Sequence, residues 1–131
     1  MKVINPSALG AARGYSNGVA ASGQTIYIAG QIGWDAQQKL VSDKFVEQLR
    51  QVLVNIVAVL EAAGASPEHL VRMTWYVKDK REYQNSQSEI GTVYREIIGR
   101  HFPAMSLFQV SDLLEDGALV EIEATAVIPE N

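Results

Sequence analysis

The chain has 131 residues, of which 47% are hydrophobic and 20% charged, with no cysteine and a formal net charge of -4. This size fits one domain, residues 1–131, that can bury enough apolar surface to fold without disulfides. The absence of cysteine excludes disulfides, zinc-thiolate sites and a cysteine nucleophile. Because Lys and Arg are few and scattered, the basic footprint of a nucleic-acid-binding protein is missing, and nucleic acid is not an expected partner.

Other functional classes are disfavoured by missing motifs. The first six residues lack the apolar core of a signal peptide, and no apolar run approaches the roughly 18 residues that cross a bilayer, so we expect a cytoplasmic protein without a membrane partner. His69 and His101 have no ligand partner at a metal-binding spacing, and neither a Gly-x-Ser-x-Gly elbow nor a phosphate-binding loop is present. We therefore predict no metal site and no cofactor.

Two strands are predicted near the start of the chain. Residues 25–32 alternate between isoleucines on one side and mostly small or polar residues on the other, which is the period of a strand. A preceding strand, residues 16–21, is expected to pair with it as a β-hairpin, because Gly23 can adopt the positive φ of a tight turn.

A long amphipathic helix is predicted next. Apolar residues recur at helical spacing after Ser42, the expected N-cap, and stop just before Gly64, a residue typical of helix C-termini. The stripe expected to face the core consists of Phe45, Leu49, Val52, Leu53, Ile56 and Leu60.

The second half of the chain predicts a second helix and three further strands. The strands span residues 71–77, 104–110 and 118–128. Asp79 followed by Glu82 has the pattern of a capping box that opens the helix, and Gly99 is expected to end it. The order is ββαβαββ, an α+β fold whose two helices pack on one face of a mixed sheet. The other face is partly polar, because Glu121 and Glu123 point to it.

Six short motifs carry a resemblance to a known family. They are Tyr15-Ser16-Asn17-Gly18-Val19, Ala29-Gly30-Gln31-Ile32, Glu61-Ala62-Ala63-Gly64, Tyr76-Val77-Lys78-Asp79, Phe102-Pro103-Ala104 and Glu121-Ile122-Glu123-Ala124. In this order and spacing the chain resembles the YjgF/RidA, or reactive intermediate deaminase, family over nearly its whole length. The resemblance implies a chorismate-mutase-like fold assembled as a homotrimer, with a central barrel and clefts between subunits. It also implies hydrolysis of a small-molecule enamine or imine to a carbonyl compound and ammonia, without a cofactor.

The resemblance also implies site residues. In the family an arginine after Phe-Pro-Ala grips the substrate carboxylate, a tyrosine and a backbone glycine line the pocket, and a glutamate on the last strand helps to place water. The matching positions here are Met105, Tyr15, Gly30 and Glu121. Tyr15 and Glu121 are thus the expected catalytic residues, and the neighbouring Gln31 and Ala104 are expected to contribute to substrate binding.

One departure from the family bears on the substrate. Met105 has a thioether instead of the planar fork of donors that holds a carboxylate, and Gly91 stands about where many members carry an asparagine. Because each charge-assisted hydrogen bond contributes about 1.5–3 kcal/mol, the expected substrate is not a small imino acid. Arg13, two residues before Tyr15, is the nearest candidate for a cation that replaces the family arginine. Arg13 could instead be an ordinary surface charge.

Each candidate residue also has a purely structural interpretation. Tyr15 and Met105 could be packing residues, and Glu121 could be a solvated or subunit-bridging carboxylate. Trp34 and Trp75 could form an aromatic wall for a ring-bearing substrate or belong to the core or an interface. The alternative function is a non-catalytic small-molecule-binding trimer. Ribonuclease activity is disfavoured by the acidic charge and the lack of a histidine pair.

Overall fold

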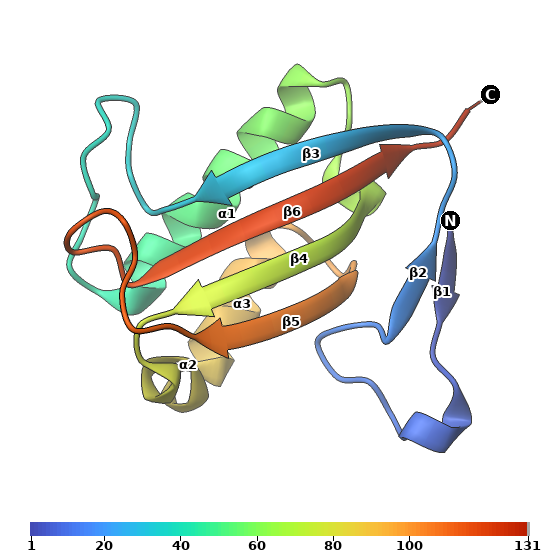
Figure 1. The fold of residues 1–131 in the computed structure, drawn as a ribbon, viewed down its shortest axis with the longest axis horizontal. Coiled ribbons are helices and arrows are strands. Elements are labelled where there is room, and N and C mark those ends of the chain that lie inside the picture. The colour runs from blue at the N-terminus through green and yellow to red at the C-terminus, as the bar shows by residue number, and fades with distance from the viewer. Residues whose placement is uncertain (131) are drawn as a thin grey trace.

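A four-stranded mixed sheet forms the centre of the structure, a computed structural model that describes residues 1–130 (Figure 1). The strands lie in the order β3 (Gln24–Gln31), β6 (Val120–Ile128), β4 (Leu70–Val77) and β5 (Ala104–Gln109). β4 and β5 are parallel, and the other neighbours are antiparallel. The predicted α+β class with a mixed sheet is confirmed.

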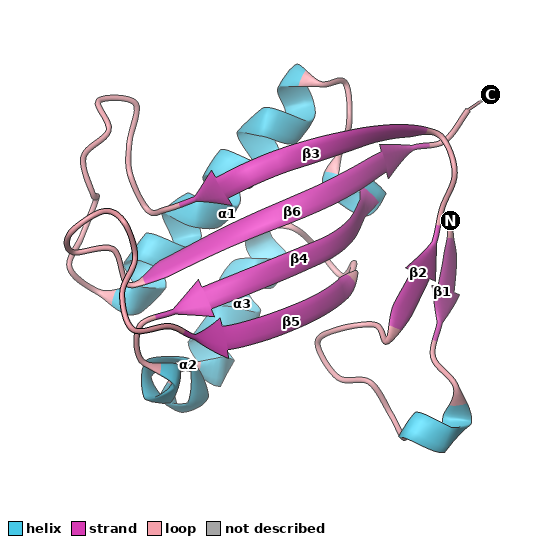
Figure 2. Ribbon diagram, viewed as in Figure 1, coloured by secondary structure: helices cyan, strands magenta, loops and turns pink. Residues whose placement is uncertain are grey.

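Two main helices cover one face of this sheet, which confirms the predicted layering (Figure 2). They are α1 (Phe45–Ala62) and α3 (Gln87–Ile97), and both lie behind the sheet in that view. All six residues of the stripe predicted for the first helix are buried. They pack against the inward side chains of β4 and β6, and each fully buried aliphatic side chain stabilises the fold by about 1.5–3 kcal/mol.

The predicted hairpin between residues 16–21 and 25–32 is wrong. β2 (Gly18–Ala20) pairs instead with β1 (Lys2–Ile4) in a separate antiparallel ribbon beside the end of the sheet (Figure 1). β3 pairs with β6, and Gly23, with a φ of 144°, lies where the chain passes from ribbon to sheet. β1 escaped prediction because its three residues are all exposed and therefore show no alternation of apolar and polar side chains.

The predicted N-cap of the first helix is also wrong. Lys44 occupies the N-cap position, and it makes no side-chain capping bond. The Ser42 hydroxyl instead accepts a hydrogen bond from the Lys44 backbone N–H at 3.0 Å, a local turn that competes with capping.

The second predicted helix is divided in two. A short helix, α2 (Lys80–Asn85), precedes α3, and the backbone leaves the helical region at Ser86, where φ is -120° and ψ is 19°. Asp79 caps α2 as predicted, but its carboxylate accepts from the backbone N–H of Arg81 at 2.9 Å instead of forming a capping box with Glu82.

A buried glutamine fixes two loops to α1 at the end of the sheet. The Gln48 amide donates to the carbonyl oxygens of Ser42 and Gly117, both at 2.9 Å, and accepts from the Leu119 N–H at 2.8 Å. Its side chain is fully buried, so these three backbone groups have no access to water as a substitute partner.

Replacing Gln48 with Leu is expected to lower the free energy of unfolding by about 3 kcal/mol or more, because each buried backbone group left without a partner costs about 1–3 kcal/mol. Urea denaturation measures the change. The control is Gln84→Leu, an exposed position on α2, where the change is expected to stay within about 0.5 kcal/mol. Equal losses in the two variants would contradict this role of Gln48.

Candidate functional site

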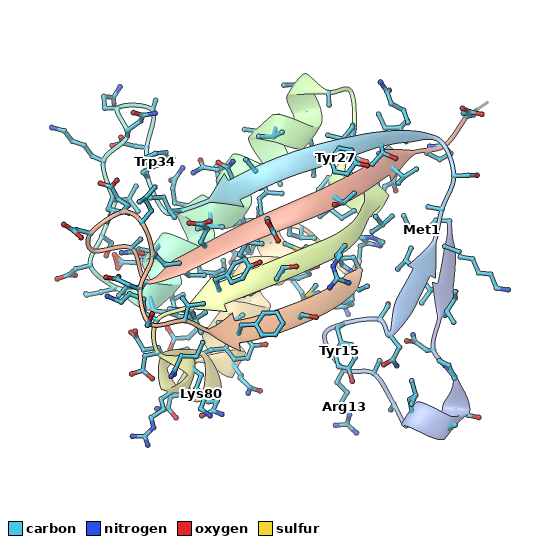
Figure 3. All side chains as sticks on the ribbon, viewed as in Figure 1. Met1, Arg13, Tyr15, Tyr27, Trp34 and Lys80 are labelled. Carbon is cyan, nitrogen blue, oxygen red and sulfur yellow. The ribbon has the colours of Figure 1, made fainter. Side chains whose placement is uncertain are left out.

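The sheet face opposite the helices, the open face, carries charged and aromatic side chains. As predicted, Glu121 and Glu123 point to this face while the alternate residues of β6 are buried. Tyr76 stacks on Phe108 there, with ring centroids 6.2 Å apart. Phe108 is 53% exposed and Tyr27 81% exposed, so the open face offers aromatic surface that this chain does not cover (Figure 3).

The two glutamates of the open face differ in their partners. Glu123 accepts a hydrogen bond from the Tyr76 hydroxyl at 2.9 Å, and this bond raises the pKa of Tyr76. The Glu121 side chain has no hydrogen bond or ion pair within residues 1–130. The carboxylate of Glu121 is therefore the one free to hold a water molecule or a ligand.

Glu121 lies directly over the backbone of Gly30. β3 has a bulge between Ile28 and Gln31, and Gly30 belongs to it. A Cβ atom at Gly30 would overlap the Glu121 carboxylate, so only glycine allows this close approach. The amide of Gln31 donates to the carbonyl of Ala29 at 3.1 Å. The motif Ala29-Gly30-Gln31-Ile32 thus has a physical role, because its backbone packs directly against the Glu121 side chain.

A second group of predicted residues lies beside β5. Ser16 anchors the preceding loop to this edge of the sheet, because its backbone N–H donates to the Pro103 carbonyl at 3.0 Å and its hydroxyl donates to the Phe102 carbonyl at 2.5 Å. The anchor places Arg13 and Tyr15 together at the edge of the sheet (Figure 3).

Two adjoining cavities, of about 190 and 260 Å³, lie between this loop, β5 and the helices, and together we call them the edge cleft. The residues that line both are Arg13, Gly14, Trp75, Tyr83 and Met105. Tyr15 lines the smaller cavity, and Gly91 and Arg95 of α3 line the larger one. Met105 is thus a wall of the cleft and also packs against the core.

The predicted site residues fall on opposite faces of the sheet. Met105 pairs with Met73, which faces the helices, whereas Glu121 pairs with Tyr76 on the open face. Ala104 precedes Met105 by one residue and therefore faces the open side, away from the edge cleft. One copy of the chain brings Arg13, Tyr15 and Met105 together, and Gly30 with Glu121, but it does not join the two groups.

Two polar groups of the edge cleft were not predicted from the sequence, the guanidinium of Arg95 and the indole N–H of Trp75. Arg95 comes from α3, and it lies against Gly91, where an added Cβ would be 3.0 Å from its Nη1 atom. Trp75 packs edge to face with Tyr83, at 5.9 Å and 82°. Its Nε1 atom is the one buried side-chain nitrogen or oxygen without a hydrogen bond in the described part of the chain. The spacing of Gly91 and Arg95, one helical turn apart, was the only signal in the sequence.

Other candidates do not belong to the cleft. Trp34 lies at the far end of the molecule from Tyr15, so within one copy Trp34 and Trp75 do not form a common aromatic wall (Figure 3). Among residues 1–130, no group of three or more His, Cys, Asp or Glu side chains could hold a metal ion. None of the described helices has both the length and the apolar character needed to cross a membrane.

Comparison with known proteins identifies the family of the chain. Residues 5–128 match the family model described as Endoribonuclease L-PSP. A RutC family protein of Pyrococcus horikoshii is 40% identical over 113 residues, which are 86% of this chain and 85% of that protein. The 2-iminobutanoate/2-iminopropanoate deaminase of Bos taurus is 38% identical over 128 residues, covering 96% of this chain and 89% of that protein.

Solved structures give the same result. The crystal structure of YyfB from Yersinia pestis, a Rid family protein whose function is unknown, superimposes with a TM-score of 0.84 and 34% identity, covering 97% of this chain and 98% of that one. The fold is therefore that of a family whose members include imine deaminases. The chain belongs to the YjgF/RidA family.

Proposed function

We propose that the chain hydrolyses a reactive imine or enamine to a carbonyl compound and ammonia, in a site formed between neighbouring copies of a homotrimer. The observation that carries the proposal is the division of the candidate site. Tyr15 lines the edge cleft, Glu121 stands on the open face of the same chain, and the open face leaves Tyr27 and Phe108 uncovered. A trimer in which the open face of one copy meets the edge cleft of the next would join the two halves and cover this aromatic surface.

The chemistry needs only water and two proton-transfer groups. Glu121 accepts a proton from water as the oxygen attacks the imine carbon, and the Tyr15 hydroxyl donates a proton to the nitrogen. The protonated Glu121 then gives its proton to the amino nitrogen of the tetrahedral intermediate, and the Tyr15 phenolate takes the hydroxyl proton. The C–N bond breaks, ammonia leaves, the carbonyl compound remains, and both side chains return to their starting protonation states. Backbone groups near Gly30 and Ala104 orient the water, and Met105 forms an apolar wall.

The substrate class follows from Met105. An arginine at this position would hold a small carboxylate through two parallel bonds, whereas a thioether provides no donor. The cleft is therefore suited to a substrate larger than a three- or four-carbon imino acid.

Ammonia release is the test of this proposal. Imines are generated in the assay by an amino-acid oxidase, and the purified chain is expected to speed their conversion to the carbonyl compound and ammonia. A chain that gains thermal stability with keto acids or imines but never releases ammonia would instead be the non-catalytic binder.

The assembly is tested separately by native mass spectrometry. We expect a trimer at micromolar concentration, since the two halves of the site meet only between copies. A monomer that still hydrolyses imines would contradict the shared site.

A further inference from the structure

We propose that Arg95 is the anion anchor of the edge cleft, for a 2-imino acid, or the corresponding 2-oxo acid, that carries an aromatic or bulky apolar side chain. The reaction of such a ligand rests on the proposed deaminase function, whereas its binding does not.

Arg95 lies beside a glycine of its own helix. Gly91 lies one turn earlier in α3, and a Cβ there would stand 3.0 Å from Nη1 and 3.7 Å from Cζ and Nη2 of Arg95. The guanidinium therefore lies close to the glycine backbone, and an alanine at position 91 would require the flexible Arg95 side chain to shift by a few tenths of an ångström.

The Arg95 guanidinium has no anionic partner in the chain. Within residues 1–130, the side chains of Arg95 and Arg13 take part in no hydrogen bond and no ion pair. The adjacent carboxylate, Glu96, is held by Arg50 of α1 at 2.8 Å. No aspartate or glutamate lines either cavity, so the edge cleft is cationic in a chain whose net charge is -4. A planar guanidinium in such a place is suited to a carboxylate.

The size and walls of the cleft indicate the rest of the ligand. Met105, Tyr83 and the ring of Trp75 give both cavities an apolar wall, and Arg95 lines only the larger one. An apolar cavity of about 150 Å³ holds benzene, so the cavity of about 190 Å³ can accept a phenyl ring while a carboxylate reaches Arg95 in the other. A three-carbon imino acid is too small to contact both.

Three stable probes separate the parts of this recognition. Phenylpyruvate has the ring, the carbonyl and the carboxylate, phenylacetone replaces the carboxylate with a methyl group, and pyruvate lacks the ring. Isothermal titration is expected to show that the wild-type chain binds phenylpyruvate at least about tenfold more tightly than either of the others.

The variants assign the contacts. Arg95→Gln is expected to weaken phenylpyruvate about tenfold and to leave phenylacetone unchanged, and Arg95→Lys, which keeps the charge without the fork, is expected to be intermediate. The matched control is Arg100→Gln, an exposed position outside both cavities, where no change is expected.

Unchanged phenylpyruvate affinity in a folded Arg95→Gln variant would overturn the inference, and so would equal losses in Arg95→Gln and Arg100→Gln. Circular dichroism and native mass spectrometry confirm that each variant is folded and assembled. A chain that binds phenylpyruvate through Arg95 but releases no ammonia refutes the deaminase proposal alone. A chain that hydrolyses imines equally well with and without Arg95 refutes the anchor alone.

Discussion

Replacing Glu121 with Gln is expected to lower kcat/KM for imine hydrolysis by about 10²–10⁴-fold, the usual contribution of a general base. The amide keeps the shape of the side chain over Gly30 but cannot accept the proton of the attacking water. The fold and the trimer are expected to persist, because the Glu121 carboxylate makes no hydrogen bond or ion pair within residues 1–130. Ammonia release measures the activity. Thermal denaturation measures the stability of the fold, and native mass spectrometry measures the trimer.

Glu123→Gln is the matched control for this variant. Glu123 lies on the same strand and the same face, but its carboxylate already accepts the Tyr76 hydroxyl at 2.9 Å. Its replacement is expected to change kcat/KM by less than about threefold, since a hydrogen-bonded carboxylate away from the reacting water contributes little to proton transfer. Similar losses in the two variants would show that the charge of the open face matters and not the position of Glu121.

Replacing Met105 with Arg is expected to raise kcat/KM for 2-iminopropanoate by about 10–100-fold. Residue 105 lines both cavities of the edge cleft, so a guanidinium there can reach a small carboxylate. Charge-assisted hydrogen bonds contribute about 1.5–3 kcal/mol, and about 1.4 kcal/mol corresponds to a factor of ten. For an aromatic imino acid the same change is expected to lower kcat/KM, because the longer side chain occupies space that the ring needs.

Met105→Lys separates the fork from the charge. An ammonium group provides attraction but not two parallel bonds, so the gain on 2-iminopropanoate is expected to be smaller than that of Met105→Arg. No gain in either variant, with the trimer intact, would mean that position 105 does not contact the substrate carboxylate.

The parts of the fold with a buried face were predictable from the sequence. The stripe of α1 and the alternation in β4 and β6 repeat because one side of each element packs in the core. The β1–β2 ribbon has no such face, since β1 is exposed throughout, and a three-residue strand leaves no period to detect. The break at Ser86 depends on one pair of dihedral angles, which the apolar pattern does not record.

The candidate site was predictable as a set of positions but not as an arrangement. Whether Met105 and Glu121 share a face depends on the registers of β5 and β6 against β4, and these become visible only when the strands are paired. Arg95 is exposed in the structure as well, and only the cavity that it lines beside Gly91 distinguishes it from other helix arginines. The unpartnered Trp75 N–H is a property of packing, and no sequence pattern reports it.

The most direct test of the substrate-binding proposal, with Met105 in place of the family arginine and Arg95 as the anion anchor, is the preference of the wild-type chain between two imines. With imines formed from phenylalanine and from alanine by amino-acid oxidases, kcat/KM is measured for each under identical conditions. A cleft with Met105 in its wall and Arg95 at its larger end is expected to favour the phenylalanine-derived imine by at least about tenfold. Equal or faster release of ammonia from the alanine-derived imine would contradict the account.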